Sequence, residues 1–199
     1  MKNNFSWGLL VNPFSRIAGW KAFVLGFIIV LLTVLVGYFS NVYFPGALDI
    51  KLITGLSLEL AFLYCFIGII SIILIMFIAS LVFAKGTRIQ DIIGTVTLSR
   101  FPYLLIAIAG IIVNENSIDT FAKYLINREY VFNIGEYTGL IVFLILTMPV
   151  IIWQIALLYN AFRVSTGLKG TKCIIVFIGT VLVAEIVSII SIYLIAKNI

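Results

Sequence analysis

Two carboxylates, Glu59 and Glu185, have the strongest potential for chemistry in this sequence, because each lies inside a long apolar run. Glu59 is the one ionisable side chain between residues 52 and 84, and Glu185 is the one between residues 173 and 196. An ionised carboxylate in hydrocarbon costs on the order of a few kcal/mol, so such a group normally faces a bundle interior, binds a partner or stays protonated.

Glu185 is the stronger candidate of the two, because it lies near the middle of its run whereas Glu59 lies nearer a boundary. Two interpretations are open. In the functional one, Glu185, with Glu59 as a second member, forms a proton or cation site or a polar pocket for a headgroup. In the structural one, the carboxylate bonds to a neighbouring helix, with Gln154 and Asn160, a tyrosine hydroxyl or a backbone carbonyl as candidate partners.

Other chemistry is poorly represented. The chain has no histidine, which removes the commonest general base and metal ligand. Cys65 and Cys173 lie inside or beside apolar runs, and we interpret them as small buried hydrophobes. No phosphate-binding glycine loop, Cys-x-x-Cys pair or nucleophilic serine motif is present. We therefore expect no catalytic residue, cofactor or metal, and no nucleic-acid partner, since the net charge of +5 is spread over turns.

Five apolar runs must position these side chains. Hydrophobic residues make up 63% of the chain and charged residues 11%, against about 45–50% and 25% in a globular domain. Crossing a bilayer takes about 20 mostly apolar residues as a helix. The sequence predicts an all-α, polytopic transmembrane bundle of five spans with short amphipathic surface helices. The predicted spans are 22–44, 52–84, 101–113, 137–162 and 173–196.

The segments outside the spans also carry patterns. Residues 1–21 form an amphipathic, cytoplasmic N-terminal segment, and residues 22–199 form the membrane domain. Within 87–100 an apolar stripe at helical spacing, with a capping-box pattern at Thr87 and Gln90, predicts an amphipathic surface helix. A second surface helix is expected within 114–136. The run 52–84 is too long for one perpendicular span, and its first residues are expected at the interface.

The distribution of basic residues predicts the orientation. With the N-terminus inside, nine of the 13 lysines and arginines fall on inner segments, so the N-terminus is expected in the cytoplasm and the C-terminus outside. Basic side chains near the inner helix ends are expected to contact anionic lipid headgroups. These candidate lipid contacts are Arg88, Arg100, Arg163, Lys169 and Lys172.

Short strings distributed along the chain resemble a known family. They are Asn12-Pro13-Phe14-Ser15-Arg16-Ile17, Leu98-Ser99-Arg100-Phe101-Pro102-Tyr103-Leu104-Leu105, and Trp153 with Leu157-Leu158 before the polar turn 165–172. Together they resemble the Yip family of Ypt/Rab-interacting membrane proteins, particularly its bacterial members. The resemblance implies a five-span bundle with a cytoplasmic N-terminus. Eukaryotic members are tied to vesicle traffic and Rab-type GTPases. The Ile- and Lys-rich composition suggests an AT-rich bacterial genome, and we expect the chain in the cytoplasmic (inner) membrane.

Two functional hypotheses follow. The first is a non-enzymatic membrane scaffold or interaction protein that organises anionic lipids or other membrane proteins and can form homo-oligomers. The second is a small transporter, channel or lipid-moving protein that uses Glu185, with Glu59, in a polar cavity. Acid–base catalysis on a lipid would depend on carboxylates alone, so we expect no enzyme.

Overall fold

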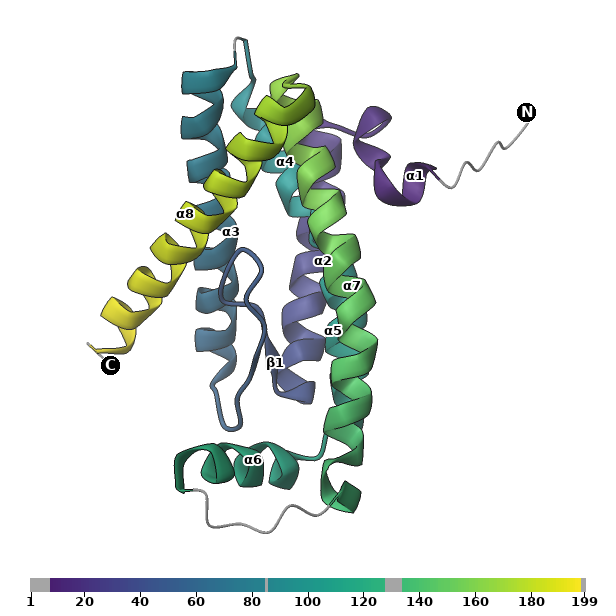
Figure 1. The fold of residues 1–199 in the computed structure, drawn as a ribbon, viewed down its shortest axis with the longest axis vertical. Helices are drawn as coiled ribbons and strands as arrows, with labels where there is room; N and C mark the ends of the chain where they lie inside the picture. Colours follow the sequence, from purple (N-terminus) through teal and green to yellow (C-terminus); the bar gives the residue numbers. More distant parts are fainter. Residues whose placement is uncertain (1–7, 85, 128–133, 198–199) are drawn as a thin grey trace.

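The computed structural model describes residues 8–84, 86–127 and 134–197, and it is almost entirely helical (Figure 1). Five helical segments of the described chain are long and apolar enough to cross a membrane, which confirms the predicted five-span, all-α bundle. They are α2 (Gly19–Ser40), α3 (Leu58–Phe83), the broken span α4 (Ile89–Ser99) with α5 (Pro102–Ala109) and η2 (Gly110–Ile112), α7 (Ile134–Thr166) and α8 (Gly170–Ala196). The chain is a multi-pass membrane protein.

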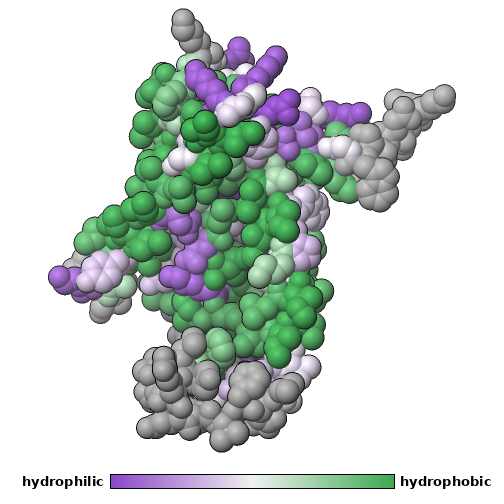
Figure 2. Space-filling view, viewed as in Figure 1, coloured by the Kyte–Doolittle hydropathy of each residue, from purple (hydrophilic) through white to green (hydrophobic). Residues whose placement is uncertain are grey.

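The two ends of the bundle differ in charge. At the end where α2 and α8 begin and α3 ends, called here the basic end, exposed cations gather, and Figure 2 shows hydrophilic surface above a hydrophobic flank. These cations are Lys21, Arg88, Arg163, Lys169 and Lys172. At the other end α6 (Glu115–Asn127) lies across the bundle (Figure 1), which confirms a helix within 114–136.

The prediction of a surface helix over 87–100 is wrong, because α4 is the buried half of the third span that lies nearer the basic end. Residues 94–99 of α4 are all buried, and the helix packs closely against α2. A Cβ on Gly26 of α2 would clash with the backbone of Leu98, so the close approach of the two helices requires a glycine at this position. The hydroxyls of Thr97 and Ser99 donate to carbonyls of their own helix, which lets a polar face be buried. The capping box is also wrong, since the N-cap is Arg88 without a side-chain cap.

The described part of the N-terminal segment docks on protein. It forms α1 (Gly8–Val11) and η1 (Pro13–Ser15), with Phe14 buried. Trp153 Nε1 on α7 donates to the Leu10 carbonyl at 2.8 Å, and Asn160 Nδ2 donates to the Val11 carbonyl at 3.2 Å. Residues 1–7 of the predicted amphipathic segment lie outside the described residues. The described part of this segment is therefore held on α7 by two side chains of that helix.

The connection between the first two spans is a hairpin that turns back into the bundle. Strand β1 (Val42–Tyr43) pairs antiparallel with β2 (Lys51–Leu52), and residues 44–50 form the loop between them. In Figure 1 this loop rises between α2 and α3 to about half the height of the bundle. The excess length of the predicted span 52–84 is explained by this hairpin, because the helix begins only at Leu58. We call residues 42–52 the re-entrant hairpin.

Candidate functional site

The tip of the re-entrant hairpin lies at mid-depth, where it contacts Gly68 of α3. A Cβ on Gly68 of α3 would be 2.7 Å from the carbonyl oxygens of Pro45 and Gly46. Gly68 is about 15 Å along α3 from Leu58 at 1.5 Å per residue. Since the hydrocarbon core is about 30 Å thick, the tip lies close to its centre. Ala47 at the tip is fully buried and belongs to a hydrophobic core built from α3, α4, α7 and α8.

Glu185 binds this tip through the backbone. Its Oε2 atom accepts hydrogen bonds from the amides of Ala47 at 2.7 Å and Leu48 at 3.1 Å. Glu185 is near the middle of α8, about 16 Å from Ala196 at helical rise. Non-helical backbone at this depth is tolerated only when it is buried in protein or lines a water-filled cavity. The carboxylate therefore satisfies two amides that hydrocarbon would leave unpaired.

Arg100 and Tyr103 bind the carbonyls of the same tip. Arg100 Nη1 donates to the Gly46 carbonyl at 3.0 Å, and the Tyr103 hydroxyl donates to the Ala47 carbonyl at 3.1 Å. The Arg100 guanidinium also lies 5.2 Å from the centre of the Tyr103 ring, which stacks on Phe44 at 4.6 Å. Both side chains come from the break between α4 and α5, in the middle of the third span. Gly46, Ala47, Leu48, Arg100, Tyr103 and Glu185 form what we call the central polar cluster.

Two glycines make the cluster sterically feasible. A Cβ on Gly46 would clash with the Glu185 carboxylate, and a Cβ on Gly68 would clash with the hairpin backbone. The break that places Arg100 is also encoded locally, because Pro102 has no amide hydrogen to continue α4 and instead begins α5. The sequence thus brings a helix break and a non-helical loop to the same depth.

Part of the polar interior has no protein partner among the described residues. Arg100 is 2% exposed, and its Nε and Nη2 atoms lack hydrogen-bond partners there. Gln154 of α7 is fully buried, and both its amide oxygen and its amide nitrogen lack partners in the same described set. Buried polar groups of this kind are usually satisfied by ordered water. The predicted pairing of Gln154 or Asn160 with Glu185 is not formed.

The structure separates the predicted intramembrane candidates. Glu59 lies exposed in the first turn of α3, where a carboxylate is favoured by the helix dipole. Asn160 holds the N-terminal segment through Val11 and also donates to Ala156 of its own helix. Gln154 is buried without a protein partner among the described residues. Glu185 alone of the four takes part in the central polar cluster.

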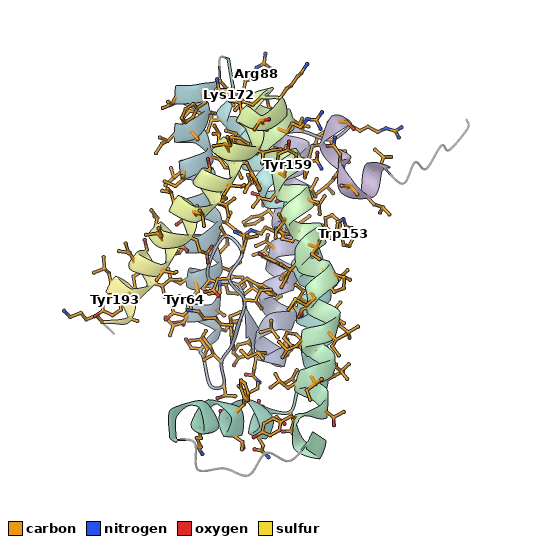
Figure 3. All side chains as sticks on the ribbon, in the orientation of Figure 1. Tyr64, Arg88, Trp153, Tyr159, Lys172 and Tyr193 are labelled. Carbon is orange, nitrogen blue, oxygen red and sulfur yellow. The ribbon has the colours of Figure 1, made fainter. Side chains whose placement is uncertain are left out.

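Four of the five predicted lipid contacts are exposed side chains at the basic end, and their contact with lipid stays a prediction. Arg88, Arg163, Lys169 and Lys172 are exposed at the basic end, and Figure 3 labels Arg88 and Lys172 there. Arg100 is different, because its guanidinium is buried at mid-depth and bound to Gly46. The helix that follows Arg100 is only the half of the third span farther from the basic end, so this residue lies halfway across the bundle. The expectation that Arg100 contacts headgroups is therefore wrong.

Sequence reasoning missed Tyr103 and the hairpin. A signal was present, because Pro45-Gly46 divides an apolar stretch that a helix cannot cross, and Arg100 stands two residues before Pro102. Within the described residues, no group of three or more His, Cys, Asp or Glu side chains could hold a metal ion. Cys65 and Cys173 are free and buried, as predicted.

Comparison with known proteins adds no assignment: no family model matches the chain, and neither a curated protein nor a solved structure matches it.

Proposed function

We propose that this protein is a non-enzymatic membrane scaffold, oriented with its basic end in the cytoplasm of a bacterial cell. The observation that carries the proposal is the use of Arg100 and Glu185. Arg100 and Glu185, two ionisable side chains at mid-depth, both bind the backbone of the re-entrant hairpin. These hydrogen bonds hold the hairpin in the bundle, and the exposed surfaces can contact lipids and partner proteins.

The surface supports the same role. Apolar side chains cover the outer faces of α2, α3, α7 and α8 and provide contact area for lipid or for other membrane proteins, including further copies of this chain. Cations concentrated at one end attract anionic headgroups, each contributing about 1 kcal/mol near a membrane surface. The resemblance to the Yip family agrees with an interaction role and belongs to this proposal.

A second candidate, a transporter or channel, is favoured by one specific observation. A broken span and a re-entrant hairpin meet at mid-depth, an arrangement common in transporters. Figure 2 shows hydrophilic surface at mid-height of the face beside α8, and Asp49 and Lys51 of the hairpin, 3.4 Å apart, are 25% and 45% exposed.

Proteoliposomes holding a pH-sensitive dye distinguish the two candidates. For a scaffold, wild type and Glu185→Gln should both leave the proton and potassium permeability of the vesicles at the level of protein-free vesicles. The variant should also melt at a lower temperature in detergent. The result that overturns the scaffold is flux in wild type that Glu185→Gln abolishes while the melting temperature stays unchanged.

A further inference from the structure

At the basic end α3 and α8 leave an apolar groove between them, with a volume of about 750 Å³. This size lies within the range of about 300–1,000 Å³ typical of ligand sites. Its lining includes Ile75, Ala79 and Phe83 from α3 and Lys172, Gly179 and Val183 from α8. A Cβ built on Gly179 meets no atom within 4 Å, so the missing side chain leaves open space in the groove.

The groove is as long as one leaflet is thick. From Lys172 to Val183 the lining follows α8 for about 16 Å, and from Ile75 to Phe83 it follows α3 for about 12 Å, at 1.5 Å per residue. Half of a hydrocarbon core is about 15 Å. The lining thus begins at the basic end and stops two residues before Glu185, close to mid-depth.

The charge in the groove is at its outer mouth. Among the described lining residues Lys172 is the one with a charged side chain. Its Nζ atom donates to the Phe83 carbonyl at 3.1 Å and lies 6.0 Å from the centre of the Phe83 ring. An ammonium has three donor hydrogens, so this bond leaves donors for a phosphate oxygen. Arg88 and Lys169 are exposed at the same end and add to the positive field.

These dimensions favour a lipid over a protein helix as the occupant. A transmembrane partner helix packs along both halves of the bilayer, whereas this lining covers one half only. A lipid of the leaflet at the basic end presents an apolar chain about one leaflet long and an anionic headgroup above it. The groove offers an apolar surface of that length with a cation at the headgroup level.

We propose that the α3–α8 groove binds one acyl chain of an anionic phospholipid, with the phosphate on Lys172. This proposal rests on the proposed scaffold function and specifies the class of lipid that the scaffold binds. Gly179 is the residue that admits the chain, and Lys172 is the residue that selects the headgroup.

Native mass spectrometry of the whole protein in mild detergent tests this site, with dioleoyl phosphatidylglycerol and dioleoyl phosphatidylcholine as probes. Wild type should retain one phosphatidylglycerol at least fivefold more tightly than phosphatidylcholine. Gly179→Leu should fill the groove and reduce retention of both lipids at least fivefold. Lys172→Gln should keep chain binding and lose most of the preference for phosphatidylglycerol.

Matched variants control for bulk and charge. Ile178→Phe adds bulk to an exposed position of α8 outside the groove lining, and Lys197→Gln removes a cation near the other end of α8. Both should behave as wild type. Equal retention of the two lipids by wild type, or no effect of Gly179→Leu, overturns the lipid site. A dimer that Gly179→Leu disrupts overturns it in favour of a second copy. Lipid retention and vesicle permeability are measured independently, so failure of the lipid site leaves the scaffold proposal to be judged by the dye experiment.

Discussion

Arg100 and Glu185 bind the two polar groups of a single peptide bond: the guanidinium donates to the Gly46 carbonyl, and the carboxylate accepts from the Ala47 amide. In a trans peptide these groups point in opposite directions, so the cation and the anion lie on opposite sides of the hairpin tip. The positive guanidinium lies at the negative, carbonyl end of the peptide dipole, and the negative carboxylate lies at the positive, amide end. Hydrogen bonds connected in this way polarise one another. The hairpin tip therefore links a charge pair across the middle of the bundle.

This linkage predicts strong coupling between the two side chains. Arg100→Met and Glu185→Gln should each lower the free energy of unfolding. For Arg100→Met we expect about 1.5–3 kcal/mol, because it removes a charge-assisted bond and leaves the buried Gly46 carbonyl without its donor. The Glu185 change should cost about 1.5–3 kcal/mol, the value of a charge-assisted bond. The double variant should cost at least about 1 kcal/mol less than the sum. Reversible unfolding in mixed micelles measures all three.

Glu59→Gln is the matched control for the Glu185 variant, because it removes an exposed carboxylate in the first turn of α3. We expect it to change the free energy of unfolding by less than about 0.5 kcal/mol. Strict additivity of the Arg100 and Glu185 variants would show that the tip does not connect them.

Two glycines of the membrane helices should respond oppositely to the same change. Gly68→Ala should lower the free energy of unfolding by about 1–3 kcal/mol, because its Cβ would lie 2.7 Å from two hairpin carbonyl oxygens that are backbone atoms. Gly179→Ala should be neutral or stabilising by up to about 1 kcal/mol, since its Cβ meets open space and alanine favours a helix. Thermal melting in one detergent compares them directly, and equal effects would contradict the tight packing at Gly68.

The features predictable from sequence were those that depend on local composition. The five spans follow from apolar length, and the exposed cations at the basic end follow from the turns that carry them. The stripe in 87–100 is helical as predicted, but it lies inside the bundle. The prediction places it at the surface because Arg88, Gln90, Asp91 and Arg100 lie mostly off the apolar stripe. In the fold, Gly94 lets α4 approach the backbone of α2 at Gly19.

The central polar cluster could not be predicted because its bonds join positions far apart in the chain. Glu185 binds the amides of Ala47 and Leu48, and backbone groups leave no trace in the type of residue that carries them. Sequence reasoning therefore looked for side-chain partners such as Gln154 and Asn160. The sequence predicts Arg100 at the end of a surface helix, and only the break before Pro102 places it halfway across the bundle.

Docking of the N-terminal segment should depend on one indole. Trp153→Phe removes the donor to the Leu10 carbonyl and can keep the edge-to-face contact with Phe101, which lies at 4.8 Å between ring centres. We expect hydrogen exchange of the amides in 8–17 to rise about fivefold or more, since a lost hydrogen bond of about 1 kcal/mol shifts a local opening equilibrium by that factor.

The depth of the hairpin gives the most direct test of the architecture. Leu48→Cys places a thiol beside the buried tip, whereas Glu59→Cys places one on the exposed first turn of α3, eleven positions later in the chain. Because the tip lies about 15 Å below the helix end, a membrane-impermeant maleimide should label the Glu59 variant in intact vesicles at least tenfold faster than the Leu48 variant. Solubilisation in a denaturing detergent should remove the difference. Equal labelling in intact vesicles would mean that residues 44–50 lie outside the membrane, and Glu185 could not then bind them from the middle of α8.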